Sequence, residues 1–139
     1  MEAFTAFVRK PGLSFPQALS NHPRRNDIDL TIALNQHESY VDALIEAGVI
    51  VEYLPPQDHL PDATFVEDTA VILEGKFLLC PMVELARQTE IQLTSSVLGK
   101  YLDHLTLDSL STLDGGDVMD TPNTIFVGLS KRTNLRAIQ

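Results

Sequence analysis

Cysteine is scarce in this sequence, and the only one is Cys80. A single thiol cannot build an internal disulfide framework, nor can it supply the several thiolates of a cysteine-rich zinc site. Basic residues are also few, with 10 Lys and Arg against 19 Asp and Glu. Because nucleic-acid binding requires a basic face, we expect no nucleic-acid partner. The acidic balance suits a cationic small molecule, although solubility alone also explains it.

Several common signatures are missing from the chain. No apolar run is long enough to span a bilayer, and residues 1–12 lack the basic-then-apolar order of a secretory signal. Histidine and cysteine do not occur at metal-ligand spacing, and the alternating acids of a calcium loop are absent. We therefore expect a cytoplasmic protein with no metal, no cofactor and no membrane partner.

The first third of the chain predicts two strands around a helix. Residues 3–9 and 49–54 are typical of strands. Apolar residues recur at helical spacing from Ala33 to Leu44, and Gly48 follows as a stop signal. The intervening residues 10–31 contain three prolines and predict a long loop, a feature that often serves as a lid over a functional site.

A hairpin with a following helix is predicted next. Residues 65–81 contain two apolar runs, joined by a turn at residues 74–76 that includes a glycine. The first run, residues 65–73, is typical of a strand and includes the adjacent carboxylates Glu67 and Asp68. Apolar positions over residues 83–102 predict a helix, and a short strand is expected within residues 102–110.

The same pattern then begins again. Residues 115–130 form a second hairpin-like stretch, and Thr133 is a suitable N-cap for a second helix. Asp68 and Asp117, about 49 residues apart, stand at the heads of the two hairpins. We interpret this as a repeated strand–strand–helix–strand (ββαβ) unit, the last of which stops within its helix. A chance resemblance between two acidic hairpins is the alternative.

The acids at the repeat heads predict a binding site for a cation. Glu67, Asp68, Asp114 and Asp117 stand beside apolar strands, and Asp62 lies just upstream. If equivalent strand ends converge, these carboxylates repel one another unless a cation, a metal or raised pKa values relieve them. A planar guanidinium is a suitable guest, because it pairs with carboxylates through two parallel hydrogen bonds. For Asp62 or Asp117 alone, a turn residue that binds backbone N–H groups is the simpler interpretation.

Three motifs together resemble a known family. They lie at residues 60–73 (LPDATFVEDTAVIL), 112–118 (TLDGGDV) and 126–134 (FVGLSKRTN), and residues 35–44 and 51–56 are similar to it as well. In this order and spacing they resemble the first half of the dimethylarginine dimethylaminohydrolases, which belong to the guanidino-modifying pentein superfamily. The glycines in the second motif favour a close backbone approach at a strand start.

The resemblance implies an α/β propeller of five ββαβ repeats, of which residues 1–139 form about the first half as one partial, C-terminally incomplete domain. It implies hydrolysis of mono- or dimethylarginine to citrulline and a methylamine by a cysteine nucleophile and a histidine, both beyond this chain. Alternatives are a non-catalytic half-propeller that binds a guanidino ligand, and a related arginine or citrulline hydrolase or amidinotransferase. We expect either a missing C-terminal half or a homo-oligomer as the partner.

The resemblance also implies roles for individual residues. Asp114 matches the acid that orients the catalytic histidine. The residues that match substrate contacts are Leu19, Asp62, Glu67, Asp68, Arg87 and Arg132. Arg87 and Arg132 each match a position at which the family binds the α-carboxylate of the substrate.

Two departures from the family pattern bear on these roles: a different sequence at residues 80–83, and no match in this chain to the nucleophilic cysteine or the catalytic histidine. Residues 80–83 read CPMV where the family usually has TRPG, which leaves open a substrate with no α-carboxylate or a different one. Cys80 lies in an apolar arm, so we expect a buried, inert thiol rather than a substitute nucleophile. None of the four histidines matches the catalytic position.

Overall fold

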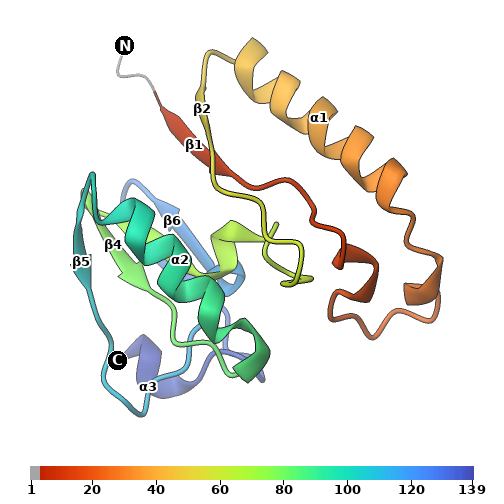
Figure 1. Ribbon diagram of the computed structural model, residues 1–139. Coiled ribbons are helices and arrows are strands. Elements are labelled where there is room, and N and C mark those ends of the chain that lie inside the picture. Colours follow the sequence, from red (N-terminus) through yellow and green to blue (C-terminus); the bar gives the residue numbers. More distant parts are fainter. Residues whose placement is uncertain (1–3) are drawn as a thin grey trace. The chain divides into compact units, whose positions relative to one another are not determined.

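The computed structural model describes residues 4–139, and the chain divides into two compact units, Met1–Val66 and Glu67–Gln139. The first unit contains β1 (Thr5–Val8), α1 (Leu30–Glu46) and β2 (Ile50–Tyr53) (Figure 1). The strands pair in parallel, so α1 is the crossover between them. The predicted strand–helix–strand order is confirmed for the described residues; Ala3, at the start of the first predicted strand, lies outside them.

Helix α1 begins earlier than the apolar pattern suggested. The Asp29 side chain accepts hydrogen bonds from the backbone N–H groups of Thr31 and Ile32, which caps the first turn at Leu30. The helix therefore takes the last residues of the predicted loop. Two short 3₁₀ turns, Phe15–Gln17 and Arg25–Asp27, occupy part of the rest.

The second unit contains one complete ββαβ repeat. Its elements are β3 (Ala70–Leu73), β4 (Lys76–Leu79), α2 (Gln88–Leu98) and β5 (Asp103–Leu105). Strand β4 pairs antiparallel with β3 and parallel with β5. Figure 1 shows α2 lying along this sheet, and the hairpin turn uses positive φ angles at its two central residues.

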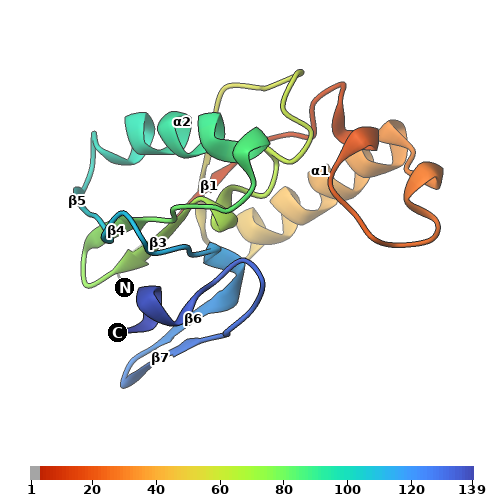
Figure 2. The same cartoon turned by 90° about the horizontal axis from the view of Figure 1, so that it is seen from below.

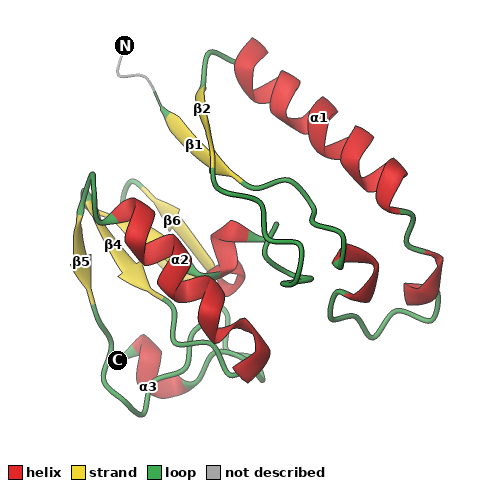
Figure 3. Cartoon of the chain, in the orientation of Figure 1, coloured by secondary structure: helices red, strands yellow, loops and turns green. Residues whose placement is uncertain are grey.

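The following repeat is only partly present. It consists of the antiparallel hairpin β6 (Val118–Thr121) and β7 (Thr124–Val127) and the single-turn helix α3 (Leu135–Ile138). Figure 3 shows the difference in length between α2 and α3. In the described residues β7 pairs with β6 alone.

Two predictions about the hairpin heads were wrong. Glu67 and Asp68 do not lie in a strand but in a 3₁₀ turn, Val66–Asp68, ahead of β3. The last bond of the β3–β4 hairpin runs from the N–H of Cys80 to Thr69 O at 3.0 Å, and the residues before Thr69 form the turn. The strand registers also align Asp117 with Thr69 rather than with Asp68, since Gly128 N bonds Asp117 O as Cys80 N bonds Thr69 O.

The two helices of the second unit also differ from expectation. The predicted helix over residues 83–102 is a 3₁₀ turn, Leu85–Arg87, followed by the shorter α2. The cap of α3 is Asn134, whose side chain accepts the Ala137 N–H, and not Thr133. The Thr133 hydroxyl is instead used inside the unit, as described below.

The core of the second unit forms around Cys80, Met82 and Leu113. The prediction of a buried Cys80 is confirmed. Burial, with added repulsion from Asp114 and Asp68, raises the pKa of the Cys80 thiol to about 12, so it stays protonated at neutral pH. Within residues 4–139, no helix combines the length and apolar character of a membrane-spanning segment.

Candidate guanidinium-binding site

A close approach between two turns of the second unit builds the candidate site. A Cβ atom on Gly115 would lie 2.0 Å from the Glu67 carbonyl oxygen, so only glycine permits this contact. A Cβ atom on Gly116 would lie 2.9 Å from Asp68 Oδ1 and 3.1 Å from Asp114 Oδ1. The predicted close approach is confirmed, and it brings the carboxylates of Asp68 and Asp114 to the same place.

These acids repel one another. Burial raises the pKa of Asp114, and the charge of Asp68 raises it further, against the opposing effects of the Gly116 N–H and Arg132. Burial likewise raises the pKa of Glu67, opposed by its own backbone N–H and reinforced by Asp68. The expected convergence of Glu67, Asp68 and Asp114 is therefore present, and with it an excess of negative charge.

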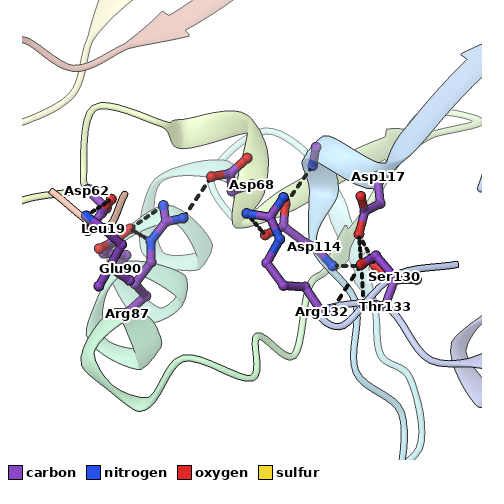
Figure 4. A network of polar contacts seen from close by, with 11 residues as sticks. Leu19, Asp62, Asp68, Arg87, Glu90, Asp114, Asp117, Ser130, Arg132 and Thr133 are labelled. Atoms are coloured by element: carbon purple, nitrogen blue, oxygen red, sulfur yellow. Dashed lines mark hydrogen bonds and ion pairs between the residues drawn. The ribbon is translucent and has the colours of Figure 1, made fainter. Parts of the chain in front are cut away.

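Arg87 holds one of these acids in place. Its Nη1 lies 2.7 Å from Asp68 Oδ2, and its Nη2 and Nε lie 2.8 and 3.0 Å from Glu90 Oε2 (Figure 4). Arg87 is 5% exposed and Glu90 1%. Although burial opposes its charge, hydrogen bonds to Glu90 and Asp68 raise the Arg87 pKa overall. The Arg87 guanidinium is therefore bound on two sides by carboxylates of its own unit.

Asp114 has one oxygen fixed and one without a hydrogen bond. Its Oδ1 accepts the Gly116 N–H at 2.9 Å. Its Oδ2 is buried, accepts no hydrogen bond from the described residues and lies 3.3 Å from Arg132 Nη1. The Arg132 side chain is 54% exposed, so its guanidinium is also accessible to other anions. Buried carboxylate oxygens rarely lack a hydrogen bond, which makes Asp114 Oδ2 a candidate acceptor for an incoming N–H donor.

A cluster of hydroxyl groups around Asp117 supports this arrangement. Asp117 Oδ2 accepts hydrogen bonds of 2.7 Å from both Ser130 Oγ and Thr133 Oγ1 (Figure 4). Ser130 Oγ in turn accepts the Arg132 N–H, and Thr133 Oγ1 accepts the Asp114 N–H. Asp117 therefore fixes the backbone positions of both Asp114 and Arg132, so the interpretation of Asp117 as a structural acid is favoured.

We expect Asp117→Ala to lower the free energy of unfolding by about 1–2 kcal/mol, because two hydroxyl groups lose a charged acceptor. Asp120→Ala, an exposed acid on β6, is the control and should change stability little. Urea unfolding measures both, and equal stability of the two variants would contradict the supporting role.

The Asp117 contribution also has a defined pH dependence. Burial opposes ionisation of Asp117, but the Thr133 and Ser130 hydroxyls and the Arg132 charge lower its pKa overall. A carboxyl with a lowered pKa binds fewer protons when folded, so its stabilisation is complete above the unfolded pKa. It should be lost as the pH falls through the folded pKa, and Asp117→Ala should remove that part of the acid-dependent loss.

Leu19 and Asp62 are brought together in the first unit. The Asp62 carboxylate accepts the Leu19 N–H at 3.1 and 3.3 Å, and Asp62 is buried (Figure 4). Arg9, also buried, binds the carbonyl oxygens of Ala63 and Pro55 on the same segment. Asp62 thus orders the predicted lid through a backbone N–H.

Among residues 4–139, no group of three or more His, Cys, Asp or Glu side chains is placed to hold a metal ion. Several supporting residues escaped sequence reasoning, namely Glu90, Ser130, Thr133 and Asn134. Only Glu90 left a local signal, because an acid three residues after an arginine on a helix forms an ion pair.

Comparison with known proteins places this geometry in context. A family model described as "N,N dimethylarginine dimethylhydrolase, eukaryotic" matches residues 15–139. The N(G),N(G)-dimethylarginine dimethylaminohydrolase of Streptomyces coelicolor is 33% identical over 140 residues, which cover 100% of this chain and 54% of that protein. The chain therefore spans about half the length of the curated relatives that it matches.

Solved structures share the fold. Dimethylarginine dimethylaminohydrolase from Pseudomonas aeruginosa, a mutant in complex with citrulline, gives a TM-score of 0.91 at 24% identity, covering 99% of this chain and 54% of that one. The N-terminal domain of ArgZ, an arginine dihydrolase from cyanobacteria, gives 0.84 at 16% identity, covering 96% and 51%. The α/β fold of this chain thus matches the N-terminal half of dimethylarginine dimethylaminohydrolase structures. At sequence identities this low, the structural similarity is evidence for the fold alone.

Proposed function

Because the chain belongs to the dimethylarginine dimethylaminohydrolase family of the pentein superfamily, we propose that it forms the guanidinium-binding half of a hydrolase. The reaction is the conversion of mono- or dimethylarginine to citrulline and a methylamine. The supporting observation is the gathering of Glu67, Asp68 and Asp114 over the Gly115–Gly116 turn, with pKa values of two of these acids raised. The complete protein is a five-fold α/β propeller, in which residues 1–139 form a partial domain.

In this proposal the carboxylates act on the guanidinium and on the catalytic histidine. Asp68 and Glu67 bind the cationic guanidinium. Within the first unit Asp62 holds the Leu19 backbone N–H, and a substrate contact by either residue stays a prediction. The buried Asp114 Oδ2 accepts the N–H of the histidine and fixes its orientation. Both the histidine and the nucleophilic cysteine lie beyond residues 1–139.

The covalent steps follow from those roles. A thiolate attacks the guanidinium carbon, and the histidine gives a proton to the departing methylamine, which leaves a covalent thiouronium adduct. Water then attacks the same carbon, the histidine accepts its proton, and the thiolate is released with citrulline. Cys80 takes no part, because its thiol is buried in the core and stays protonated.

The arginines bind the substrate carboxylate in this scheme, and the structure supports them unequally. The exposed Arg132 side chain can reach a ligand while its backbone is held by Ser130. The Arg87 guanidinium is already bound by Asp68 and Glu90, so a direct carboxylate contact by Arg87 stays a prediction. Arg87 has a further role in the proposal, which is to hold Asp68 in the orientation that the substrate meets.

A second candidate function is guanidino-ligand binding without turnover. The one thiol within the described residues is buried in the core. A related arginine dihydrolase or amidinotransferase chemistry would use the same acids. Citrulline release from dimethylarginine distinguishes hydrolysis of methylated arginine from all of these.

Titration calorimetry of the chain tests the binding function. We expect dimethylarginine and agmatine to bind, with an affinity that falls as the pH is lowered from 7 toward 4. A guanidinium favours the ionised acids, so binding releases protons wherever Glu67 and Asp114 carry raised pKa values.

The Arg132→Ala variant serves as the control for ligand orientation. It should weaken dimethylarginine, which has an α-carboxylate, and leave agmatine unchanged. If Arg132→Ala weakened the binding of both ligands equally, Arg132 would have a structural role. If the unsubstituted chain bound neither ligand, the proposed site would be rejected. In the complete protein, binding without citrulline release would favour the non-catalytic candidate.

A further inference from the structure

The buried stripe of α2 carries polar groups where a helix that covers a sheet is usually apolar. Its buried residues are Glu90, Thr94 and Leu98, and the helix lies over one face of the sheet that contains β3 and β4 (Figure 2). Glu90 and Thr94 are each 1% exposed. We propose that Glu90 and Thr94 are positioning residues that together fix the orientation of Asp68, an inference that rests on the proposed function of Asp68 in binding the guanidinium.

Glu90 acts on Asp68 through the side chain of Arg87. Glu90 Oε2 accepts hydrogen bonds from Nη2 and Nε of Arg87 at 2.8 and 3.0 Å, on one edge of the guanidinium. Arg87 Nη1 donates to Asp68 Oδ2 at 2.7 Å (Figure 4). Because a guanidinium is rigid and planar, the contacts on one edge determine the direction of the third N–H. Glu90 thereby determines where the Asp68 carboxylate lies.

Thr94 acts on the backbone beside Asp68. The Thr69 hydroxyl donates a hydrogen bond of 2.8 Å to Thr94 Oγ1, and Thr69 and Thr94 are each 1% exposed. The Thr69 carbonyl oxygen accepts the Cys80 N–H at 3.0 Å. The residue that directly follows Asp68 is thus held through its side chain by α2 and through its backbone by the segment after β4. Helix α2 therefore constrains both the side chain and the backbone of the binding acid.

The charge of Glu90 also keeps Asp68 attractive to a second cation. The carboxylates of Asp68 and Glu90 share one guanidinium, so the two acids and Arg87 together retain a negative charge. If residue 90 were neutral, Asp68 alone would balance the Arg87 charge, and less attraction would remain for a substrate guanidinium. Glu90 is therefore expected to influence affinity for a cation without touching it.

A purely structural role for these polar side chains is the alternative. Well-packed apolar residues often stabilise a fold as much as a buried ion pair does, or more. An apolar stripe on α2 would cover β3 and β4 as well as the present one. Stability alone therefore gives little reason for an acid and a hydroxyl at positions 90 and 94, whereas the orientation of Asp68 depends on both.

Titration calorimetry of the 139-residue chain with agmatine tests the two routes, because agmatine has a guanidinium but no carboxylate. Glu90→Gln keeps the size of the side chain and removes its charge, and it should weaken agmatine binding about 10-fold. Thr94→Val keeps the shape and removes the hydroxyl, and it should weaken binding about 5-fold, the effect of one neutral hydrogen bond. Thr94→Ser keeps the hydroxyl and should bind agmatine like the unsubstituted chain.

Two exposed positions of the second unit provide matched controls. Asp103→Asn removes an exposed carboxylate from β5, and Ser96→Ala removes an exposed hydroxyl from α2. Each control changes the same chemical group as the corresponding test variant, at a site that does not lead to Asp68. Neither should alter the affinity for agmatine.

The pKa of Asp114 is a readout that needs no ligand and that a merely structural role would not move. Burial raises this pKa, and the charge of Asp68 raises it further. In Glu90→Gln the Arg87 charge offsets Asp68 more fully, so the Asp114 pKa should fall. In Thr94→Val it should shift because Asp68 moves, and in both controls it should stay the same. Carboxyl NMR titration measures these values.

Unchanged affinity and an unchanged Asp114 pKa in Glu90→Gln and Thr94→Val would overturn the proposal. So would an equal loss of affinity in Thr94→Ser and Thr94→Val, because packing and not the hydroxyl would then be responsible. If the unsubstituted chain bound no agmatine, but the Asp114 pKa changed in the two test variants alone, the proposed guanidinium binding would be rejected. The positioning of Asp68 by α2 would then still be supported.

Discussion

Replacing Arg87 by Met should lower the free energy of unfolding by about 3–5 kcal/mol, the range found when one partner of a buried ion pair is removed. Arg87 is the cation between Asp68 and Glu90, and Glu90 is 1% exposed. Without the guanidinium, two carboxylates are left close together with little solvent to stabilise their charges. Urea unfolding of the variant, with circular dichroism as the signal, measures the loss.

The chain offers a matched control for this substitution. Arg136 forms an ion pair of 2.6 Å with Asp108, but both side chains are largely exposed. Arg136→Met should therefore shift the urea midpoint only slightly, because exposed ion pairs contribute little to stability. Equal shifts for Arg87→Met and Arg136→Met would show that the buried pair is not what stabilises the unit.

A double variant distinguishes two contributions to this cost: the loss of the Arg87–Glu90 ion pair, and the burial of a Glu90 carboxylate without that partner. If the cost of Arg87→Met comes from an unpaired Glu90, Arg87→Met/Glu90→Met should be more stable than the single variant, because the second substitution removes the buried charge. A double variant that is less stable than Arg87→Met would mean that Glu90 stabilises the helix by another route.

Local patterns were sufficient to predict the order of elements. The β1–α1–β2 segment, the first hairpin and the ββαβ order of the second unit follow from apolar periodicity and from turn residues. The close backbone approach predicted from the adjacent glycines of the second motif is also confirmed. Two glycines directly before a strand are typical of such a contact.

The errors arose where distant residues decide the outcome. Asp68 was predicted within a strand, but it lies in the 3₁₀ turn Val66–Asp68, where its side chain binds Arg87. Thr133 resembled a helix cap, but its hydroxyl binds Asp117 and Asn134 caps the helix instead. In both cases a tertiary hydrogen-bond partner, invisible to a local pattern, overrode the local preference.

The candidate site, like the fold, could be predicted only in part. That acids gather was predictable from the repeat, because equivalent strand starts tend to converge. The partners of those acids were not, since Arg87 reaches Asp68 across 19 positions and Thr133 reaches Asp114 across the same separation. Burial, which determines the direction of each pKa shift, depends on such packing and cannot be obtained from residue types alone.

Replacing Asp68 by Asn should weaken guanidino-ligand binding about 100-fold or more, because the guanidinium loses a charged, part-buried acceptor. The variant keeps the shape of the side chain, and Arg87 retains Glu90, so the fold should persist. Asp108→Asn, which removes an exposed carboxylate of the same unit, controls for net charge and should leave affinity unchanged. Unchanged affinity of Asp68→Asn in titration calorimetry would reject the site assignment.

The same variant makes a second readout available that requires no ligand. The charge of Asp68 is one of the causes that raise the pKa of Asp114 and of Glu67. Asp68→Asn should therefore lower both pKa values, which carboxyl NMR titration detects residue by residue. Lowered pKa values with unchanged ligand affinity would mean that the acids interact as the structure shows but that the guanidinium binds elsewhere. Weakened affinity together with lowered pKa values is the result expected if one cluster of carboxylates both repels itself and binds the cation.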